Sequence, residues 1–284
     1  MISLSSIDLV RKTRAKWKAE GHRVALVPTM GNLHDGHMKL VEQAKKETDR
    51  VMVSIFVNPL QFGPSEDLEA YPRTFSQDYE RLQKAGVHAL YHPTAQEMYP
   101  AGQGREVLID VPSIGADLCG AWRPGHFSGV ATVVAKLFNQ VMPDVAIFGE
   151  KDYQQLLLIR KLVRELDYPI EILSVPTHRE IDGLAMSSRN GYLDESKRKQ
   201  AALIYASLSL AAEALKSGHE SFAAIESNHV GILQSQGFSV DYFSIRRSSD
   251  LAIPRPGEKD LVILVAARIS GVRLIDNVRL QVEG

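Results

Sequence analysis

The segment Arg23–His37, with the sequence RVALVPTMGNLHDGH, gives the clearest indication of the fold of the first half of the chain. Its first part, Arg23–Pro28, is an apolar run ended by a proline, which predicts a strand buried on both faces. Gly31 and Gly36 follow, and the apolar residues of His37–Thr48 then recur at helical spacing. A buried strand that leads through a glycine-containing turn into a helix is typical of an open α/β sheet.

The same alternation of strands and helices continues to about Pro176. The further predicted strands are Val51–Val57, Val87–His92, Val145–Phe148 and Ile170–Val175. The further predicted helices are Thr74–Ala85, Phe127–Val141 and Tyr153–Leu166. This order favours a parallel sheet with crossover helices, so we expect a doubly wound α/β domain over residues 1–176.

The pattern changes after Pro176 and predicts a smaller α+β domain over residues 177–284. Two long helical stretches are expected first, Asp194–Leu215 and Ser221–Gln236. The predicted strands then follow at Val240–Ile245, Leu261–Ile269 and Val272–Leu280, with a tight turn at Ser270-Gly271. In the first domain, Ala101–Arg105 (AGQGR) is expected to be a mobile loop.

The composition is that of an ordinary globular protein and excludes several classes. Of 284 residues, 44% are apolar and 24% are charged, and the net charge is -1. Nucleic-acid binding usually comes with a basic excess, which is absent here. The longest apolar run, Leu261–Ala267, is far shorter than a membrane-spanning helix, and Met1–Asp8 has no secretory signal pattern. With Cys119 as the single cysteine, we expect a cytoplasmic protein without disulfides.

The motif PTMGNLHDGH (Pro28–His37) stands where open α/β sheets bind ligands, beyond the carboxyl end of a strand. A helix that begins there offers unpaired N–H groups to an anion. The spacing of Gly31 and Gly36 resembles a P-loop, but His37 and Met38 replace its lysine and hydroxyl residue, which excludes that interpretation. What is left is a pair of imidazoles, His34 and His37, able to donate hydrogen bonds to a phosphoryl oxygen. The alternatives are an ordinary pair of surface histidines and a stray metal site.

The segment Gly149–Asp152 (GEKD) follows another predicted buried strand. Lys151 would then stand at the same edge of the sheet, where an ammonium group can hold a phosphate. Asp152 and Gln155 also satisfy the spacing of a helix capping box, so part of this segment is explained by helix initiation alone.

The third segment is Met186–Asn190 (MSSRN), whose two hydroxyls and guanidinium suit phosphate oxygens. By composition alone it is equally an ordinary loop. Weaker candidates are Asn58 and Gln61, which could bind a polar substrate or only form a turn around a proline. Others are Arg123 with His126, which could meet a carboxylate or phosphate, and Asp78 with Glu80, which could touch a magnesium ion; each of these could equally be a solvated surface group.

With these segments in view, nearly the whole chain resembles the pantoate–β-alanine ligase family. The resemblance rests on six segments in family order: PTMGNLHDGH, FVNPLQF (Phe56–Phe62), YPRT (Tyr71–Thr74), RPGHFSGVATVVAKL (Arg123–Leu137), FGEKDYQQ (Phe148–Gln155) and DGLAMSSRNGYL (Asp182–Leu193). His34–His37 is also similar to the HIGH signature of the nucleotidylyltransferase superfamily, and MSSRN to its KMSKS-type phosphate loop.

The resemblance implies a cytoplasmic ATP-dependent ligase of pantothenate biosynthesis. Such enzymes condense (R)-pantoate with β-alanine to pantothenate, AMP and pyrophosphate through a pantoyl adenylate, using Mg²⁺. They are homodimers with a Rossmann-like N-terminal domain and a smaller C-terminal domain that closes over the nucleotide, and neither a nucleic acid nor a membrane is an expected partner.

The resemblance also implies roles for individual residues. The catalytic residues would be His34, His37, Lys151, Ser187, Ser188 and Arg189. The nucleotide would contact these and Thr29, Met30, Gly31, Gly149, Asp152, His178 and Met186. The other substrate would contact Pro28, Met30, Asn58, Gln61, Arg123 and Gln155. Asp78 is the expected metal ligand.

Three other hypotheses stay open from sequence. The first is a simple nucleotidylyltransferase of the same superfamily, which would not need an amine acceptor. The second is a module related to tRNA synthetases, against which the balanced charge argues. The third is a non-catalytic nucleotide sensor, for which His34, His37 or Lys151 would be expected to be missing.

Overall fold

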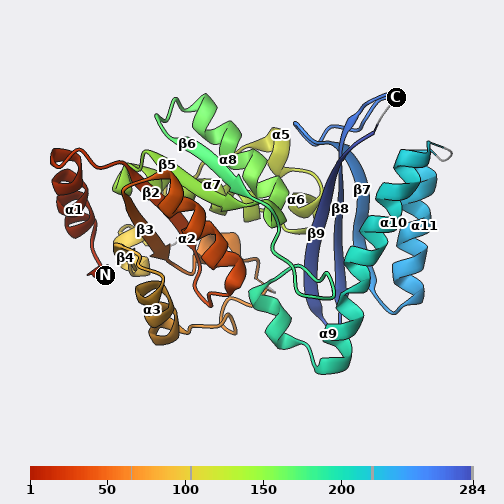
Figure 1. Ribbon diagram of the computed structural model, residues 1–284, viewed down its shortest axis with the longest axis horizontal. Helices are drawn as coiled ribbons and strands as arrows, with labels where there is room; N and C mark the ends of the chain where they lie inside the picture. Colours follow the sequence, from red (N-terminus) through yellow and green to blue (C-terminus); the bar gives the residue numbers. More distant parts are fainter. Residues whose placement is uncertain (65, 103, 219–220, 283–284) are drawn as a thin grey trace. The chain divides into compact units, whose positions relative to one another are not determined.

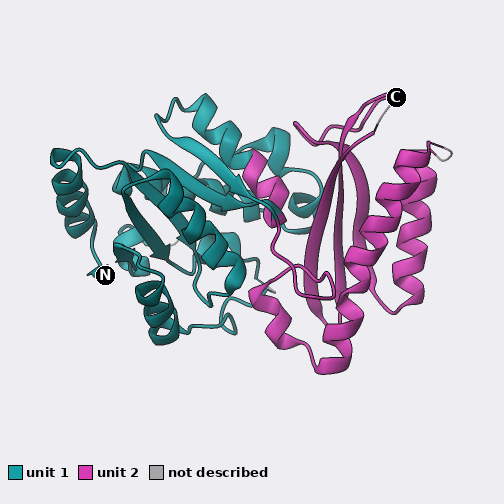
Figure 2. Cartoon of the chain, in the orientation of Figure 1, with its two compact units in different colours: residues 1–150, 158–176 teal, residues 151–157, 177–284 magenta. Residues whose placement is uncertain are grey.

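The computed structural model describes residues 1–64, 66–102, 104–218 and 221–282. The chain forms two compact units (Figure 2). The first consists of Met1–Glu150 and Leu158–Pro176, and the second of Lys151–Leu157 and Thr177–Gly284. One limit lies at the predicted boundary, but the expectation of two continuous domains differs from the structure, because Lys151–Leu157 groups with the second unit.

The first unit is built on a six-stranded sheet in which every neighbouring pair is parallel (Figure 1), as predicted. The order across the sheet is β1-β4-β3-β2-β5-β6. The strands are β1 (Ile2–Leu4), β2 (Val24–Thr29), β3 (Arg50–Ile55), β4 (Ala89–Tyr91), β5 (Val145–Gly149) and β6 (Glu171–Val175). The edge strand β1 was not predicted, because three residues are too few for a periodic signal.

The central strands are buried on both faces, which explains their unbroken apolar runs. Val24, Val51 and Val145 are all 0% exposed. Helix α2 packs against four of the strands and crosses in front of the sheet in Figure 1, while α1 packs on α7. The helices of this unit are α1 (Ile7–Ala19), α2 (Asp35–Glu47), α3 (Phe75–Lys84), α4 (Ala95–Met98), α5 (Pro112–Gly115), α6 (Cys119–Trp122) and α7 (His126–Val141), with the 3-10 turn η1 (Pro59–Gln61). The 3-10 turn η2 (Glu150–Asp152) and helix α8 (Tyr153–Glu165) each have residues in both units.

Helix α1 was missed by the sequence analysis, although Ser6 caps it by accepting the N–H of Leu9. Its buried residues are only Val10, Arg14 and Trp17, so its apolar stripe is weak. Arg14 donates to both carboxylate oxygens of Asp144, at 3.1 and 3.0 Å, and this contact could not be read from local sequence.

The strand order reverses between β2 and β5. From β2 the chain proceeds through β3 to β4 on one side, and from β5 to β6 on the other, while β2 and β5 pair directly with each other. In open α/β sheets, ligands bind beyond the carboxyl ends of the strands at this reversal. The two strands that flank it are the ones that lead into PTMGNLHDGH and GEKD.

The second unit is an antiparallel sheet with helices packed on it. The sheet has the order β7-β8-β9, formed by β7 (Ser239–Arg247), β8 (Asp260–Ile269) and β9 (Val272–Gln281). Its other elements are η3 (Ser188–Tyr192), α9 (Glu195–Ala201), α10 (Leu203–Ser217) and α11 (Phe222–Ser235). Ala201, Leu208, Ile263 and Val265 belong to a core that the helices and the sheet share.

Two details of this unit test the predictions. The turn Ser270-Gly271 has φ of 50° and 80°, as a tight hairpin between β8 and β9 requires. The single helix predicted over Asp194–Leu215 is instead two helices that meet at Ala202.

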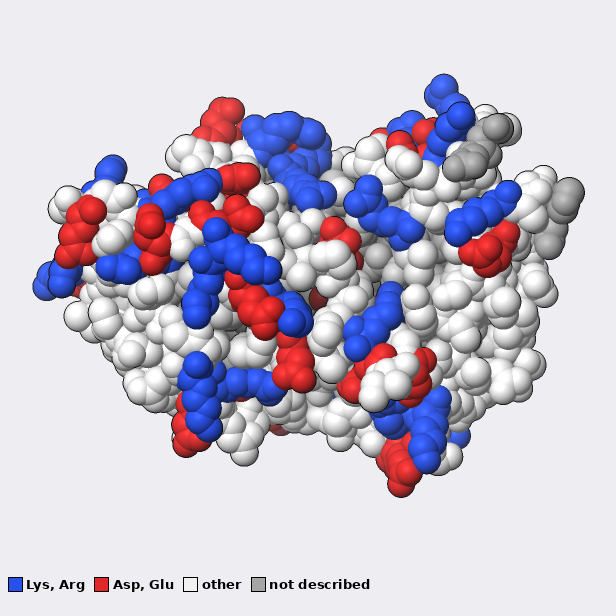
Figure 3. All heavy atoms as spheres, in the orientation of Figure 1, with Lys and Arg blue, Asp and Glu red and all other residues white. Residues whose placement is uncertain are grey.

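Two further predictions concern loops and membranes. Gln103, within the expected mobile loop Ala101–Arg105, lies outside the described residues. Across the described part of the chain, no helix combines the length and apolar character needed to cross a membrane. On the face shown in Figure 3, the Lys and Arg side chains are interspersed with Asp and Glu, consistent with the balanced composition.

Candidate functional site

The loop between β2 and α2 is hydrogen-bonded to one buried carboxylate, that of Asp78 in α3. Its Oδ2 accepts the main-chain N–H of Asn32 at 2.9 Å, and its Oδ1 accepts that of Leu33 at 2.8 Å. Thr74 donates its hydroxyl to the same group at 3.1 Å. Gly31 stands in the left-handed region with φ of 83°, and an added Cβ would lie 3.1 Å from Asp78 Oδ2. Because Gly31 has no side chain, the loop can lie close enough to the carboxylate of Asp78 to form these hydrogen bonds.

These contacts do not fit Asp78 as a metal ligand. Its side chain already accepts three protein hydrogen bonds, and the residue is only 3% exposed. Among the described residues, no group of three or more His, Cys, Asp or Glu side chains is arranged to hold a metal ion. The expected metal role of Asp78 therefore gains no support, and the contacts assign it to shaping the loop.

His34 and His37 meet at the start of α2. His34 is the N-cap residue, and its main-chain N–H donates to Nδ1 of His37 at 3.2 Å. The ring centroids are 4.1 Å apart. His37 thus takes the place of the Glu or Gln of a capping box. Because Nδ1 accepts, a neutral His37 carries its proton on Nε2, and this nitrogen is then the hydrogen-bond donor of the ring.

Asn58 and Gln61 follow β3 around η1, and they contact each other. The buried Asn58 donates through Nδ2 to Gln61 Oε1 and to the carbonyl of Gly129, both at 3.1 Å. Gln61 Nε2 in turn donates to the sulfur of Met30 at 3.2 Å. Gln61 is therefore held beside the loop that follows β2, as a substrate-orienting residue would need to be.

Asn58 differs from its predicted role. Its Oδ1 accepts from the hydroxyl of Tyr99 at 2.8 Å and from the N–H of Leu60 at 3.3 Å, so protein groups surround the amide. Burial, followed by the charge of Glu106, raises the pKa of Tyr99, which keeps that hydroxyl a proton donor. These contacts favour a role for Asn58 in positioning Gln61, and its contact with a substrate stays a prediction.

Gly129 on α7 makes room for η1. A Cβ at this position would lie 2.3 Å from the carbonyl oxygen of Leu60 and 2.7 Å from the nitrogen of Gln61. Any larger residue would displace the turn that carries Gln61. The glycine belongs to the family-like segment RPGHFSG, but the sequence analysis gave it no role, since a glycine within a helix predicts no partner by itself.

Arg123 is engaged by a carboxylate of the protein itself. Its Nε and Nη2 donate to the two oxygens of Glu66 at 2.6 and 2.5 Å, and Nη1 lies 3.1 Å from His126 Nε2. Burial opposes ionisation of Glu66, yet the hydrogen bond and charge of Arg123 hold the pKa of that carboxyl below its ordinary value of 4.5. The predicted contact of Arg123 with a substrate carboxylate therefore has Glu66 as a competitor.

In the second unit, the segment that carries Lys151 is attached to the antiparallel sheet. Asn277 of β9 donates through Nδ2 to the carbonyl of Lys151 at 2.9 Å. Tyr153 donates its hydroxyl to the carbonyl of Ser248 at 2.8 Å. Lys151 Nζ lies 4.0 Å from Asp152 Oδ2. These contacts explain why Lys151–Leu157 belongs to this unit.

The MSSRN loop is built on a small hairpin. The N–H of Met186 donates to the carbonyl of His178 at 3.0 Å, and Arg179 pairs with Ala185 in an antiparallel bridge. Ser187 accepts the N–H of Arg189 on its hydroxyl oxygen at 3.2 Å, and η3 begins at the next residue. The Ser187 oxygen is only the acceptor in this bond, so the hydroxyl retains its own proton for donation.

The predicted site residues therefore fall into two groups. The first unit holds Pro28, Thr29, Met30, Gly31, His34, His37, Asn58, Gln61, Asp78, Arg123 and Gly149. The second holds Lys151, Asp152, Gln155, His178, Met186, Ser187, Ser188 and Arg189. The convergence of His34, His37 and Lys151 on one phosphorus stays a prediction.

Several residues of this region carry no signal in the sequence. Glu66, Tyr99, Arg179, Asp276 and Asn277 act through partners far along the chain, and only the folded structure identifies those partners.

Comparison with known proteins gives a consistent result along the whole chain. The sequence model of the family described as pantoate-beta-alanine ligase matches residues 3–279. The pantothenate synthetase of Pseudomonas aeruginosa strain UCBPP-PA14 is 51% identical over 283 residues, which is 99% of this chain and 100% of that protein.

Two solved structures are also similar. The crystal structure of pantothenate synthetase from Thermus thermophilus has a TM-score of 0.90 and 44% identity, covering 98% of this chain and 99% of that one. That of pantoate-beta-alanine ligase from Francisella tularensis, complexed with beta-gamma ATP and beta-alanine, has a TM-score of 0.83 and 34% identity, covering 98% and 97%.

Proposed function

This chain belongs to the pantoate–β-alanine ligase family, and we propose that it joins (R)-pantoate to β-alanine while ATP is converted to AMP and pyrophosphate. The observation that carries the proposal is the pairing of β2 with β5 at the reversal of strand order. The first strand leads into the loop with His34 and His37, and the second leads into Lys151. The solved relative that binds an ATP compound and β-alanine supports the same reaction.

In the first half-reaction, a carboxylate oxygen of pantoate attacks the α-phosphorus of ATP. The bond from this phosphorus to the bridging oxygen breaks, and pyrophosphate leaves with the electron pair. Such a reaction needs positioning and charge stabilisation rather than an enzyme nucleophile. The Nε2–H of His37 and the ring of His34 stabilise charge on the α-phosphoryl oxygens, and Lys151 holds the phosphates.

The remaining nucleotide contacts come from the other predicted residues. Ser187, Ser188 and Arg189 bind the β- and γ-phosphate oxygens and then pyrophosphate. The nucleoside side of the site is formed by Thr29, Met30, Gly31, Gly149, Asp152, His178 and Met186. Pantoate is oriented by Gln61 and Gln155 and lies beside Pro28 and Met30. Asn58 and Arg123 support Gln61 by donating hydrogen bonds to its side-chain and main-chain oxygens.

In the second half-reaction, the amine of β-alanine attacks the carbonyl carbon of pantoyl adenylate. AMP leaves, the nitrogen loses a proton, and pantothenate is formed. Exclusion of water matters at this stage because water would hydrolyse the mixed anhydride. We assign residues 177–284 the role of a lid during this step.

Mg²⁺ and the homodimer are parts of the proposal that rest on the family resemblance. Since Asp78 is occupied by hydrogen bonds, we assign no protein ligand to Mg²⁺ and derive no step through it. Two exposed apolar residues, Val107 (85%) and Leu108 (59%), support a surface for a second copy of the chain. We place the enzyme in the cytoplasm, which fits a chain with Cys119 as its one cysteine.

The experiment that tests the function separates the two half-reactions. The purified protein is mixed with ATP and pantoate without β-alanine, and the products are identified by mass spectrometry. Pantoyl adenylate and pyrophosphate are expected, and later addition of β-alanine should give pantothenate and AMP. Absence of the adenylate would contradict the proposal, and pyrophosphate release with no amide formed after β-alanine is added would favour a simple nucleotidylyltransferase.

A matched pair of lysine variants extends this test. Lys151→Ala should slow adenylate formation, since it removes the cation assigned to the phosphates. Lys161→Ala removes a lysine that pairs with Glu165 on α8 and should leave the rate unchanged. Equal rates for the two variants would contradict the role of Lys151.

A further inference from the structure

We propose that Asp276 and Asn277, neighbours on β9, are positioning residues that hold the main chain at Lys151 and the base of the MSSRN loop in register with each other. Successive side chains of a strand point to opposite faces, so one dipeptide can reach two segments. Both residues are buried, with exposures of 4% and 6%. The inference rests on the proposed function, because it concerns the residues assigned to the phosphates.

Asn277 acts on Lys151 through the main chain. Its Nδ2 donates to the carbonyl of Lys151 at 2.9 Å, although the residues are 126 positions apart. A lysine ammonium stands on a flexible four-carbon stem, so the position of its main chain decides which atoms it can reach. The bond between Tyr153 and Ser248 then fixes the residues that follow. The segment from Lys151 to the start of α8 is thus attached both to β9 and to the turn that follows β7.

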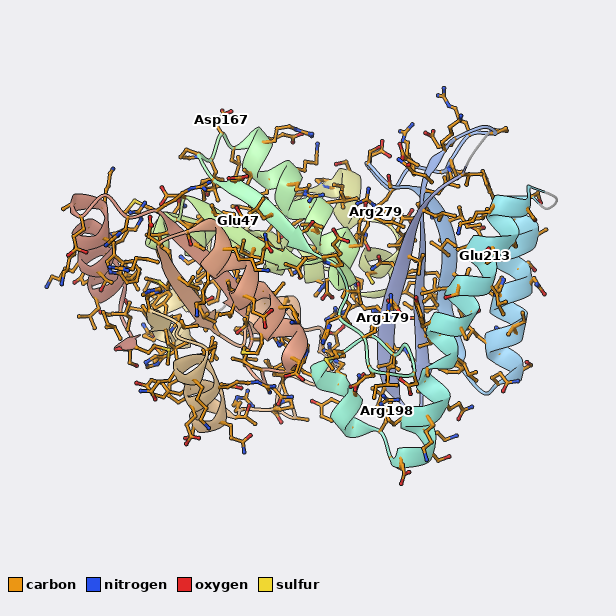
Figure 4. All side chains as sticks on the ribbon, viewed as in Figure 1. Glu47, Asp167, Arg179, Arg198, Glu213 and Arg279 are labelled. Carbon is orange, nitrogen blue, oxygen red and sulfur yellow. The ribbon has the colours of Figure 1, made fainter. Side chains whose placement is uncertain are left out.

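Asp276 acts on the loop through Arg179. Its carboxylate accepts from both terminal nitrogens of this guanidinium, at 2.6 and 3.0 Å, and Figure 4 shows Arg179 beside β9. The carbonyl of Asn277 accepts a hydrogen bond from the same guanidinium at 3.2 Å. The central carbon of the Arg179 guanidinium lies 3.8 Å from the ring centre of Tyr205. Arg179 is therefore committed to protein partners.

From Arg179 the contacts continue to the loop. Its Nη1 donates to the carbonyl of Gly183 at 3.1 Å, which fixes the hairpin between Arg179 and Ala185. Asn190 then donates to the carbonyl of Ala185 at 3.1 Å and ties the far end of MSSRN to the same hairpin. Every link joins described groups of the second unit. The two residues are also hydrogen-bonded to each other, because Asp276 Oδ1 accepts the main-chain N–H of Asn277 at 2.7 Å.

A purely structural role would make the same dipeptide important for stability alone, and the sheet contains a matched control for this. Asp241 on β7 has a side chain that is 3% exposed, equal to that of Asp276, and it is paired with Arg273 at 2.7 Å. Asp241 has no contact with Lys151 or the hairpin among the hydrogen bonds and ion pairs of the described residues. Asp241→Asn therefore measures what the loss of a buried arginine–carboxylate pair does by itself.

The test compares Asn277→Ala, the nearly isosteric Asn277→Asp, Asp276→Asn and Asp241→Asn in the full chain. Single-turnover rates are measured for adenylate formation and, with preformed pantoyl adenylate, for attack by β-alanine. Since misplacement of a catalytic group by about 1 Å can cost 10²-fold, both Asn277 variants should slow adenylate formation by about 10-fold or more. Amine attack should change by less than about twofold. Asp276→Asn should raise the KM for ATP, and Asp241→Asn should alter neither step.

Hydrogen exchange gives a readout that needs no reaction. The peptide that covers Lys151–Leu157 should exchange faster in both Asn277 variants than in the wild type, and at the wild-type rate in Asp241→Asn. Wild-type adenylation with unchanged exchange in the Asn277 variants would overturn the inference. So would equal losses in both half-reactions, or in all four variants. If the wild type makes no adenylate, the proposed function fails, while the exchange data still decide whether the dipeptide holds the segment.

Discussion

The hydrogen bond from the main-chain N–H of His34 to Nδ1 of His37 links local structure to chemistry at the scale of single residues. It satisfies a donor at the helix start, and it also selects which ring nitrogen of His37 carries the proton. The spacing of two histidines predicts that they are neighbours but not which nitrogen faces a ligand. That choice follows from a helix that begins at Asp35.

The assignment of the two nitrogens can be tested by two amides. His37→Gln places its amide group near the position of Nε2, whereas His37→Asn places it near Nδ1. If Nε2–H is the donor to the phosphoryl group, His37→Gln should retain more of the turnover. His37→Ala should lose about 10²–10³-fold, the scale of one transition-state donor.

The measurement is the single-turnover rate of adenylate formation, with His22→Gln as a control at a half-buried histidine beside Arg50. Greater retention by the asparagine variant would show that the tautomer is reversed. Activity of His37→Ala within about twofold of wild type would remove His37 from the mechanism.

At the scale of elements, helix α3 determines the shape of the loop that joins β2 to α2. The contact depends on Asp78, which stands one turn into α3 and 45 positions from Leu33 in the chain. A carboxylate on this helix was expected to bind a metal, and its three hydrogen bonds to protein groups favour a role in holding the loop.

We expect Asp78→Asn to destabilise the protein by about 1–3 kcal/mol, because one of the two loop N–H groups then faces an amide donor. The Mg²⁺ concentration for half-maximal rate should stay unchanged. Lys84→Gln, on an exposed position of the same helix and not a metal candidate, is the control and should leave both quantities near wild type. Thermal unfolding and an Mg²⁺ titration check this, and a marked rise in the Mg²⁺ requirement of Asp78→Asn would restore the metal role.

A second contact between elements, the pair of Glu66 and Arg123, predicts a pH dependence. The pKa of Glu66 is lower in the folded protein than its ordinary value of 4.5, because the hydrogen bond and charge of Arg123 outweigh burial. The unfolded chain therefore binds the proton more readily than the folded one. The stabilisation is present above the ordinary pKa and is lost as the pH falls through the lowered one.

The melting temperature of wild type should accordingly exceed that of Glu66→Gln at pH 7, and the difference should shrink below pH 4.5. Glu69→Gln, at an exposed neighbouring position, serves as the control. A difference that stays constant from pH 7 to pH 3.5 would mean that the pair does not titrate as described.

At the scale of the whole molecule, Val107 and Leu108 are two adjacent apolar side chains that a single chain leaves exposed. Val107 is 85% and Leu108 59% exposed, and residues 107–110 belong to no helix or strand. Exposed apolar side chains in sequence often mark an interface. Together with the family resemblance, they support a homodimer that buries this segment.

Val107→Glu should shift the protein from dimer to monomer in sedimentation velocity, since the interface would have to bury a charge. Ile253→Glu places the same charge on a residue that is 78% exposed and should leave the wild-type state unchanged. A wild type that sediments as a monomer, or a Val107→Glu variant that stays dimeric, would place the interface elsewhere or remove it.

Local sequence patterns were enough to predict the parallel sheet of the first unit and the antiparallel sheet of the second, and to locate the motifs for which ligand contacts are proposed. These features depend on local signals: apolar runs such as Val24–Val27, helical spacing, glycines, and motif residues that directly follow a strand. The ends of β2 and β5 could be recognised in this way, and with them His34, His37 and Lys151.

The partner of each polar side chain became known from the folded chain alone. Asp78 reaches Leu33 across 45 positions, Arg123 reaches Glu66 across 57, and Asn277 reaches Lys151 across 126. The break at Ala202 and the attachment of Lys151–Leu157 to the second unit likewise came only from the structure. The reason is physical: a buried polar group must be hydrogen-bonded, but packing brings its partner to it, and no periodic pattern in the chain records that choice.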